Sequence, residues 1–282
     1  MHNRENRHVN ARRNFGGIAV LFKNSFICEY DITVIDKSID GVLVFKFTHI
    51  DTMHNVLFIA MYLPPEKSPW GRNAEEHFDN ITSLIHMYSV ECDTICMCGD
   101  FNARIGNNDD FILGLDKINP RIAIDKTNNK HGETLLEFII ENKMCIVNGR
   151  INQTHDNYTF ISTRGKSVVD YFLVSIDNLK DCKTFEVHQS RELFEKYCNI
   201  ADTELVGCIP DHSLLKLSIE IPSSFVNVEC IADTNDMIQN EDYDMTHIPE
   251  MYFKKYQIYG NLDNFLNSDE DNTEITNLIE KI

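Results

Sequence analysis

Short apolar runs bounded by glycine, asparagine or proline recur along the first 221 residues and predict β-strands. Two longer segments, 73–90 and 132–144, place apolar residues three and four positions apart and predict amphipathic helices. Polar stretches at 103–130 and 189–210 predict loops. The predicted strands are 16–22, 41–47, 55–65, 93–98, 145–149, 158–162, 167–175, 183–188 and 212–221. This order predicts an α+β fold in which sheets are layered and helices lie outside.

The composition changes after Ile221, where sequences such as NDMIQNEDYDM and NSDEDNTEI carry few apolar residues. From Glu220 onward there are 14 acidic residues against three lysines, a net charge of −11 out of −18 for the chain. We therefore expect three parts: a basic stub at 1–15, a folded domain at 16–221, and an acidic extension at 222–282 that is partly disordered or helical. The extension is a candidate surface for protein partners.

Several classes of protein are disfavoured by the composition. The chain is 43% hydrophobic, which is enough for a sizeable core, but no window holds 18 consecutive apolar residues. The N-terminus has no apolar stretch behind its charges, so neither a membrane span nor a secretory signal is expected, and an intracellular location is. The overall negative charge disfavours simple binding to nucleic acid, although residues 1–219 are only mildly acidic.

The nine cysteines are an odd number, and several lie inside apolar runs, which is typical of buried thiols rather than a disulfide framework. The sequence CDTICMC at 92–98 could form a metal knuckle. It lacks a second Cys or His pair at finger spacing, so a strand is the better interpretation.

Four short motifs fall at the ends of predicted strands: MYLPP, CGDFNARIG, VVDYFLVS and IPDHSLLKL. Each alone is more often an ordinary turn or cap than a site. Asp170 is harder to explain in this way, because it interrupts an apolar strand, where an unpaired carboxylate is costly. Hard oxygen ligands such as Asp100, Asp170 and Asp211 suit Mg²⁺ or Mn²⁺.

The order and spacing of these motifs resemble the endonuclease/exonuclease/phosphatase superfamily, whose fold is that of pancreatic deoxyribonuclease, a two-sheet sandwich flanked by helices. The closer resemblance is to the endonuclease domain of LINE-type non-LTR retrotransposons and to proteins called craniofacial development protein 2-like. It rests on GDFNARIG, KHGETLLEFIIENKMCIVNG, YTFISTRGKSVVDYFLVS and DHS, and it covers about residues 16–220.

The resemblance implies a metal-dependent phosphodiesterase that acts on DNA with Mg²⁺ or Mn²⁺. It implies that Asp100 orients or deprotonates the attacking water and that Asn102 donates its amide to water or phosphate. It implies that His212 lies against the scissile phosphate while Asp170 orients its ring.

Three further roles follow from the same resemblance. Asp211 is the implied metal ligand, Tyr62 would direct its phenol at the phosphate, and Thr159 would contact the phosphate. Ordinary structural roles stay open beside these: a strand-end aromatic for Tyr62, a β-branched strand residue for Thr159, and a turn former for Asn148, which precedes Gly149.

The sequence departs from the family pattern in two places. Family members have two strands ahead of GGIA that supply a metal-site Asn and the principal metal-binding Glu, whereas 15 residues precede Gly16 here. The chain is therefore expected to be N-terminally truncated and its activity impaired. Pro210 also stands where the subgroup has Ser, and a proline cannot donate a backbone hydrogen bond.

Two alternative functions stay open. One is a non-catalytic remnant of the fold that acts as a binding or scaffold protein through its acidic extension. The other is a superfamily enzyme that acts on a small phosphorylated molecule. The basic sequence RHVNARR near the N-terminus favours nucleic acid if it lines a groove.

Overall fold

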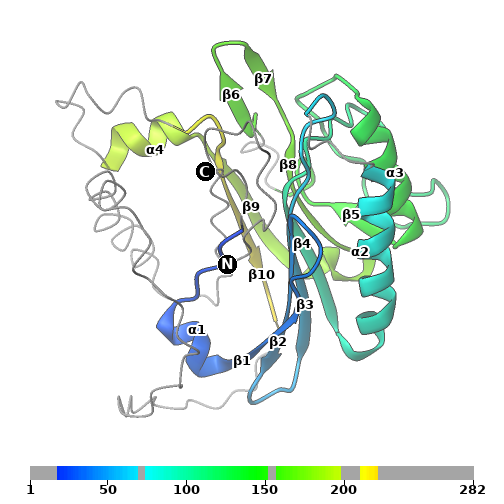
Figure 1. Ribbon diagram of the computed structural model, residues 1–282, viewed down its shortest axis with the longest axis vertical. Helices are drawn as coiled ribbons and strands as arrows, with labels where there is room; N and C mark the ends of the chain where they lie inside the picture. The colour runs from blue at the N-terminus through cyan, green and yellow to red at the C-terminus, as the bar shows by residue number, and fades with distance from the viewer. Residues whose placement is uncertain (1–17, 69–73, 152–156, 198–209, 222–282) are drawn as a thin grey trace, which may run out of the picture.

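The computed structural model describes residues 18–68, 74–151, 157–197 and 210–221 (Figure 1). The predicted basic stub at 1–15 and the acidic extension at 222–282 lie outside the described residues, so both stay predictions. The expected truncation concerns the sequence before Gly16, which the structure does not describe, and it also stays a prediction. Within the described residues, none of the helices has the length and the apolar run needed to cross a bilayer.

A mixed sheet forms the centre of the domain, in the order β1-β2-β3-β4-β8-β5. β3 and β4 are parallel, and the other neighbouring pairs are antiparallel. Most residues of β2, β3 and β4 are buried, as expected for strands that are covered on both faces. The strands are β1 (Tyr30–Asp36), β2 (Val42–His49), β3 (Asn55–Tyr62), β4 (Thr94–Asp100), β5 (Met144–Ile146) and β8 (Asp170–Ser175).

Two helices cover one face of this sheet, α2 (Ala74–Tyr88) and α3 (Lys130–Glu141) (Figure 1). Their apolar residues at three- and four-residue spacing pack on alternate residues of the strands, and Phe78 of α2 stacks on Phe138 of α3 with ring centroids 4.8 Å apart. The structure therefore confirms the two amphipathic helices that the spacing of apolar residues predicted.

A second, smaller sheet covers the other face and consists of β9 (Cys182–His188) and β10 (Leu214–Ile219), which are antiparallel. Its apolar residues share a core with the opposite faces of β2, β3, β4 and β8, and Phe185 contacts Phe172 edge to face. The short helix α1 (Asn24–Glu29) adds Phe26, whose ring meets Phe47 at 5.4 Å. The predicted α+β fold, a two-sheet sandwich with helices outside, is therefore confirmed.

The structure corrects several of the predicted elements. Residues 18–22 form no strand beyond one bridge at Ile18, because Phe22 packs its ring across Phe45 and Phe47 instead of joining a ladder. Part of the predicted loop after 189 is the helix α4 (Ser190–Tyr197). The predicted strand 167–175 is divided into β7 (Gly165–Ser167) and β8, and β7 pairs with β6 (Phe160–Ser162). In the part of the chain that the structure describes, 3₁₀ helices that the sequence patterns did not indicate include η1 (Ser89–Glu91) and η3 (Ile176–Asp181).

A buried ion pair holds the long loop between β4 and α3 against the sheet. The carboxylate of Asp110 accepts hydrogen bonds from the guanidinium of Arg150 at 2.6 and 2.8 Å and from the backbone N–H of Ile146 at 2.7 Å. Burial acts against the charged form, but these bonds outweigh it and leave the pKa of Asp110 below its ordinary value.

Candidate active site

Three of the predicted site residues meet because of strand register. Asp100 ends β4 and Asp170 begins β8, and the antiparallel ladder places them directly opposite each other. Tyr62 ends β3 and is the parallel partner of Asp100. Side chains alternate along a strand, so all three lie on the face that packs against β9 and β10. The site therefore lies at one end of the interface between the two sheets.

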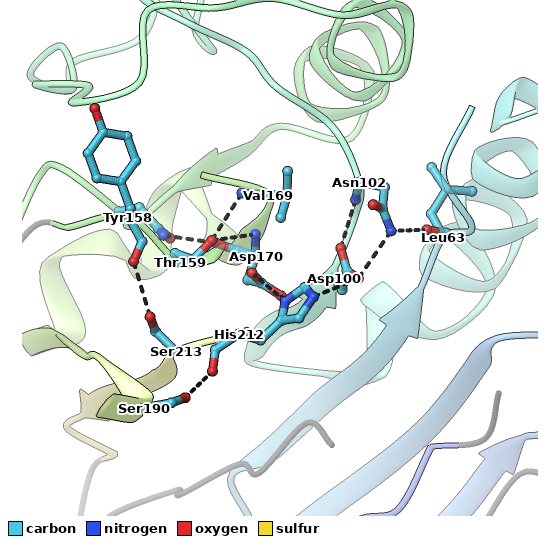
Figure 2. A network of polar contacts seen from close by, with 11 residues as sticks. Leu63, Asp100, Asn102, Tyr158, Thr159, Val169, Asp170, Ser190, His212 and Ser213 are labelled. Carbon is cyan, nitrogen blue, oxygen red and sulfur yellow. Dashed lines mark hydrogen bonds and ion pairs between the residues drawn. The ribbon is translucent and has the colours of Figure 1, made fainter. Parts of the chain in front are cut away.

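His212 reaches this site because the segment before β10 pairs with residues 159–161, at the start of β6. The backbone N–H of Ile161 donates to the carbonyl of Asp211 at 2.8 Å, and that of Ser213 donates to the carbonyl of Thr159 at 2.7 Å. The side chains of Ser213 and Ser190 donate to the carbonyls of Tyr158 and His212 (Figure 2). These bonds fix the backbone on both sides of the imidazole.

The imidazole of His212 lies between two carboxylates (Figure 2). Nδ1 is 3.0 and 3.1 Å from the two carboxylate oxygens of Asp170, and Nε2 is 3.9 Å from Oδ2 of Asp100. An ionised carboxylate can only accept, so Nδ1 carries the proton that is shared with Asp170. This tautomer leaves Nε2 directed toward Asp100, where a reacting group would lie.

Asp170 is 5% exposed, so little water reaches its carboxylate. Burial, and then the nearby charge of Asp100, raise the pKa of Asp170 to about 6, against the opposing effect of the hydrogen bonds from His212 and Thr159. Two carboxylates placed close together away from water repel each other, and a bound cation would relieve this repulsion. Raised carboxylate pKa values of this kind cluster at functional sites.

The donor atoms fit a hard divalent cation. Asp100, Asp170 and His212 each offer one atom, and these atoms lie within 4.8 Å of one another. Carboxylate oxygens are the ligands that Mg²⁺ and Mn²⁺ prefer, with water and substrate oxygens completing the shell. Among the described residues, Asp100 and Asp170 are therefore the candidate ligands.

Asp211, which the resemblance implied as the metal ligand, is not part of that group. It is exposed, and its carboxylate is not among the donor atoms that lie within 4.8 Å of one another in the cluster of Asp100, Asp170 and His212. Asp100, Asn102, Asp170 and His212 therefore lie together, whereas the carboxylate of Asp211 lies outside the cluster of possible metal ligands.

Thr159 has a different position from the one that a phosphate contact requires. It is 0% exposed, and its hydroxyl oxygen accepts from the backbone N–H groups of Val169 at 3.0 Å and Asp170 at 3.1 Å. The hydroxyl also hydrogen-bonds the carboxylate of Asp170, which acts to lower the pKa of that group. In this structure Thr159 fixes the start of β8, and its burial is at odds with direct contact to a phosphate.

Asn102 lies two residues after Asp100 with a positive φ of 46°, a conformation that Asn tolerates better than most residues. Its backbone N–H donates to Oδ1 of Asp100 at 3.0 Å, and its amide donates to Oδ2 of Asp100 at 3.1 Å and to the carbonyl of Leu63 at 2.8 Å (Figure 2). Both amide hydrogens are thus used within the protein. In this conformation Asn102 orients Asp100 and has no amide hydrogen left for a phosphate.

Tyr62 is half-buried, and its ring packs at the edge of the core between the sheets. It shares the face of Asp100 through the register of β3 and β4, which is the position expected of it. Its backbone N–H donates to the carbonyl of Gly41 at 2.8 Å, which ties the end of β3 to the turn before β2.

The sequence patterns gave no site role to Asn148, which was interpreted as a turn former before Gly149. The turn exists, with Gly149 at φ 76°, but the side chain of Asn148 is buried and bridges two backbone groups of β8. It donates to the carbonyl of Asp170 at 3.1 Å and accepts from the N–H of Phe172 at 3.0 Å. A polar residue directly after the apolar run CIV was the signal that could have indicated this role.

Comparison with known proteins gives a family and several distant structural likenesses. Residues 56–192 match the family model described as Endonuclease-reverse transcriptase. No curated protein sequence matches the chain.

Among solved structures, the chain is similar to the endonuclease domain of TRAS1, a telomere-specific non-LTR retrotransposon (15% identity, 72% of this chain and 73% of that chain, TM-score 0.47). It is also similar to the 3'-5' exonuclease NExo from Neisseria meningitidis (14%, 68% and 71%, TM-score 0.44). A third is the AP endonuclease LMAP from Leishmania major (12%, 65% and 55%, TM-score 0.44).

The matched range contains the strands that carry Tyr62, Asp100 and Asp170, and it ends before His212. This part of the chain belongs to the endonuclease/exonuclease/phosphatase superfamily, as the order of the motifs predicted.

Proposed function

We propose that the domain is a metal-dependent phosphodiesterase that cleaves DNA, with Asp100, Asp170 and His212 at its centre. The observation that supports this most directly is the buried carboxylate of Asp170 within 3.0 Å of Nδ1 of His212, which leaves Nε2 of the same ring facing Asp100. An imidazole held in one tautomer beside a second carboxylate suits proton transfer and charge stabilisation at a phosphate.

The two groups that face the reacting atoms have complementary tasks in this proposal. Asp100, whose two oxygens are held by Asn102, orients the attacking water and accepts its proton. When the ring carries a second proton on Nε2, this N–H of His212 donates to the phosphate oxygens, where negative charge grows during attack. Asp170 keeps the ring in place and balances its charge, so it acts on the reaction through His212.

A divalent cation, Mg²⁺ or Mn²⁺, would neutralise charge on the phosphate. Asp100 and Asp170 would hold it, because these are the described carboxylates whose oxygens lie near each other and near the reacting groups. Asp211, the ligand that the resemblance implies, stays a sequence-based alternative that a binding experiment can decide.

DNA is the proposed substrate for two reasons. The description of the matching family names an endonuclease, and the motifs GDFNARIG, YTFISTRGKSVVDYFLVS and DHS follow the order found in endonucleases of LINE-type retroelements. A retroelement origin is part of this proposal. The predicted impairment depends on the segment before Gly16, and the scaffold alternative depends on residues 222–282; both stay predictions that the assay below addresses.

The test is nicking of supercoiled plasmid by the full chain with and without Mg²⁺. His212→Ala should reduce the rate by about 10²- to 10⁴-fold, the usual contribution of a general acid or base. His188→Ala is the matched control, because His188 also pairs with a carboxylate, Glu186, at 3.0 Å, but from β9 and outside the cluster.

Nicking that depends on Mg²⁺, survives His188→Ala and is lost with His212→Ala would support the proposal. A folded wild-type chain that shows no nicking above the protein-free background would contradict the enzymatic proposal and favour the scaffold alternative. Equal nicking by wild type and His212→Ala would show that the cluster is not the active site.

A further inference from the structure

Asn129 lies at the first turn of α3 and connects this helix to the loop that follows β4. It is the N-cap of the helix, and its side-chain oxygen accepts from the backbone N–H of Gly132 at 2.8 Å. The same oxygen accepts from the N–H of Arg104 at 2.7 Å, and the N–H of Asn129 donates to the carbonyl of Arg104 at 3.0 Å. The side-chain amide of Asn129 donates to the carbonyl of Asn102 at 3.0 Å.

The hydrogen bonds of Asn129 reach Asn102, the residue that orients Asp100. Asn102 holds both carboxylate oxygens of Asp100, one through its backbone N–H and one through its amide. The direction of the Asp100 carboxylate therefore depends on the backbone of Asn102, and Asn129 holds the carbonyl of that backbone.

The loop needs such support, because Asn102 has a φ of 46°. A residue in the left-handed region persists where the surrounding structure fixes it. The first turn of α3 presses closely on the loop: a Cβ atom at Gly132 would lie 2.0 Å from the carbonyl oxygen of Arg104. The buried ring of His131 also lies near the backbone of Asn102.

We propose that Asn129 is a positioning residue for the reaction: its amide group fixes Asn102 and thereby holds Asp100 in the orientation that the attacking water requires. The proposal rests on the proposed function, in which Asp100 acts on that water. It assigns a task to the polar residue before KHGETLLEF beyond the capping of α3.

The test compares Asn129→Asp with Asn142→Asp in the full chain. Asn129→Asp keeps the oxygen that caps α3, since Asp is as good an N-cap as Asn, but it replaces the donor to Asn102 by an acceptor. Asn142 is the matched control at the C-terminal end of the same helix, where its amide donates to Thr82 and to the carbonyl of Phe138, both at 2.9 Å. Both variants lose amide donors at a cap of α3, but Asn129 is the one that donates to the site residue Asn102.

Two measurements decide the outcome. In Asn129→Asp, kcat for nicking should fall about tenfold or more with KM within about twofold, as is typical when a supporting residue is removed. Hydrogen exchange at the backbone N–H of Asn102, which donates to Asp100, should accelerate by about tenfold or more, while exchange in β4 stays unchanged. Asn142→Asp should lower the melting temperature without either effect.

Unchanged exchange at Asn102 in a folded Asn129→Asp variant would overturn the proposal, as would an equal loss of kcat in Asn142→Asp. If Asn129→Asp does not fold, Asn129→Ser replaces it, because the serine hydroxyl caps the helix but is too short to reach Asn102. The exchange measurement needs no activity. A wild-type chain that fails to nick would therefore contradict the proposed function and leave the positioning of Asp100 to be decided by exchange alone.

Discussion

The carboxylate of Asp170 and the imidazole of His212 are 42 residues apart in the chain and 3.0 Å apart in space. The first begins a strand of the large sheet, and the second precedes a strand of the small sheet, so the pair joins the two layers of the sandwich. The pair also places a buried negative charge beside Asp100, which makes the site electrostatically unfavourable in the absence of a cation.

Asp170→Asn should make the metal-free protein more stable at neutral pH while abolishing nicking. Folding raises the pKa of Asp170 from 3.8 to about 6, which corresponds to on the order of 3 kcal/mol. A raised pKa adds stability below the unfolded value of 3.8, and this stability is lost as pH rises through 6. The gain in melting temperature for Asp170→Asn should therefore be small at pH 4 and largest at pH 7 to 8.

Asp110→Asn is the control for this experiment, because hydrogen bonds to Arg150 overcome the effect of burial and hold the pKa of the Asp110 carboxyl below its ordinary value. Its contribution to stability is present at neutral pH and is lost as pH falls. Thermal denaturation from pH 4 to 8 should thus show Asp110→Asn destabilised most at neutral pH. Equal pH profiles for the two variants would contradict the conclusion that folding raises the pKa of Asp170 and lowers that of Asp110.

Mg²⁺ or Mn²⁺ should raise the melting temperature of the wild-type chain, because a ligand that binds only the folded state adds about 2.7 kcal/mol at 100 times its Kd. Asp100→Asn should remove most of this shift, since Asp100 lies in the cluster of possible ligands. Asp211→Asn, which alters an exposed carboxylate, should retain it. The reverse result would restore Asp211 as the ligand implied by the sequence resemblance.

Gly99→Ala should destabilise the fold by about 3 kcal/mol or more, because a Cβ atom there would lie 1.8 Å from the carbonyl oxygen of Met61 in the neighbouring strand. Gly165→Ala separates this clash from backbone strain. Gly165 has a φ of 150°, close to the 152° of Gly99, but nothing lies within 4 Å of its added Cβ. Urea denaturation should show the larger loss at Gly99, and equal losses would mean that φ alone decides the cost.

The sequence determined the helices and strands that bury one face, because their geometry requires a regular spacing of apolar residues. The pattern at 73–90 and 132–144 gave α2 and α3, and the short apolar runs gave most of the strands, because one buried face imposes a period that is visible in the chain. The isolated carboxylate in VVDYFLVS also indicated Asp170 as a paired group, since an unpaired charge is costly in a buried strand.

The patterns failed where the packing partner is distant in sequence. Residues 18–22 are as apolar as a strand, but the ring of Phe22 packs against Phe45 and Phe47. The strand β1 has a mostly exposed or half-buried pattern, so its alternation carried little signal. Thr159 and Asn148 were indistinguishable from ordinary strand and turn residues, because their hydrogen bonds go to β8.

The sequence by itself therefore determined the residue types of the site and the order of the strands that carry them. Only the tertiary structure decided which of these residues meet. Register in the β4–β8 ladder sets Asp100 opposite Asp170, and the pairing of residues 211–213 with 158–161 brings His212 to them and leaves Asp211 exposed. The physical reason is that a shift of one residue along a strand reverses the face of every side chain, and the hydrogen bonds that fix the register are made between segments far apart in the chain.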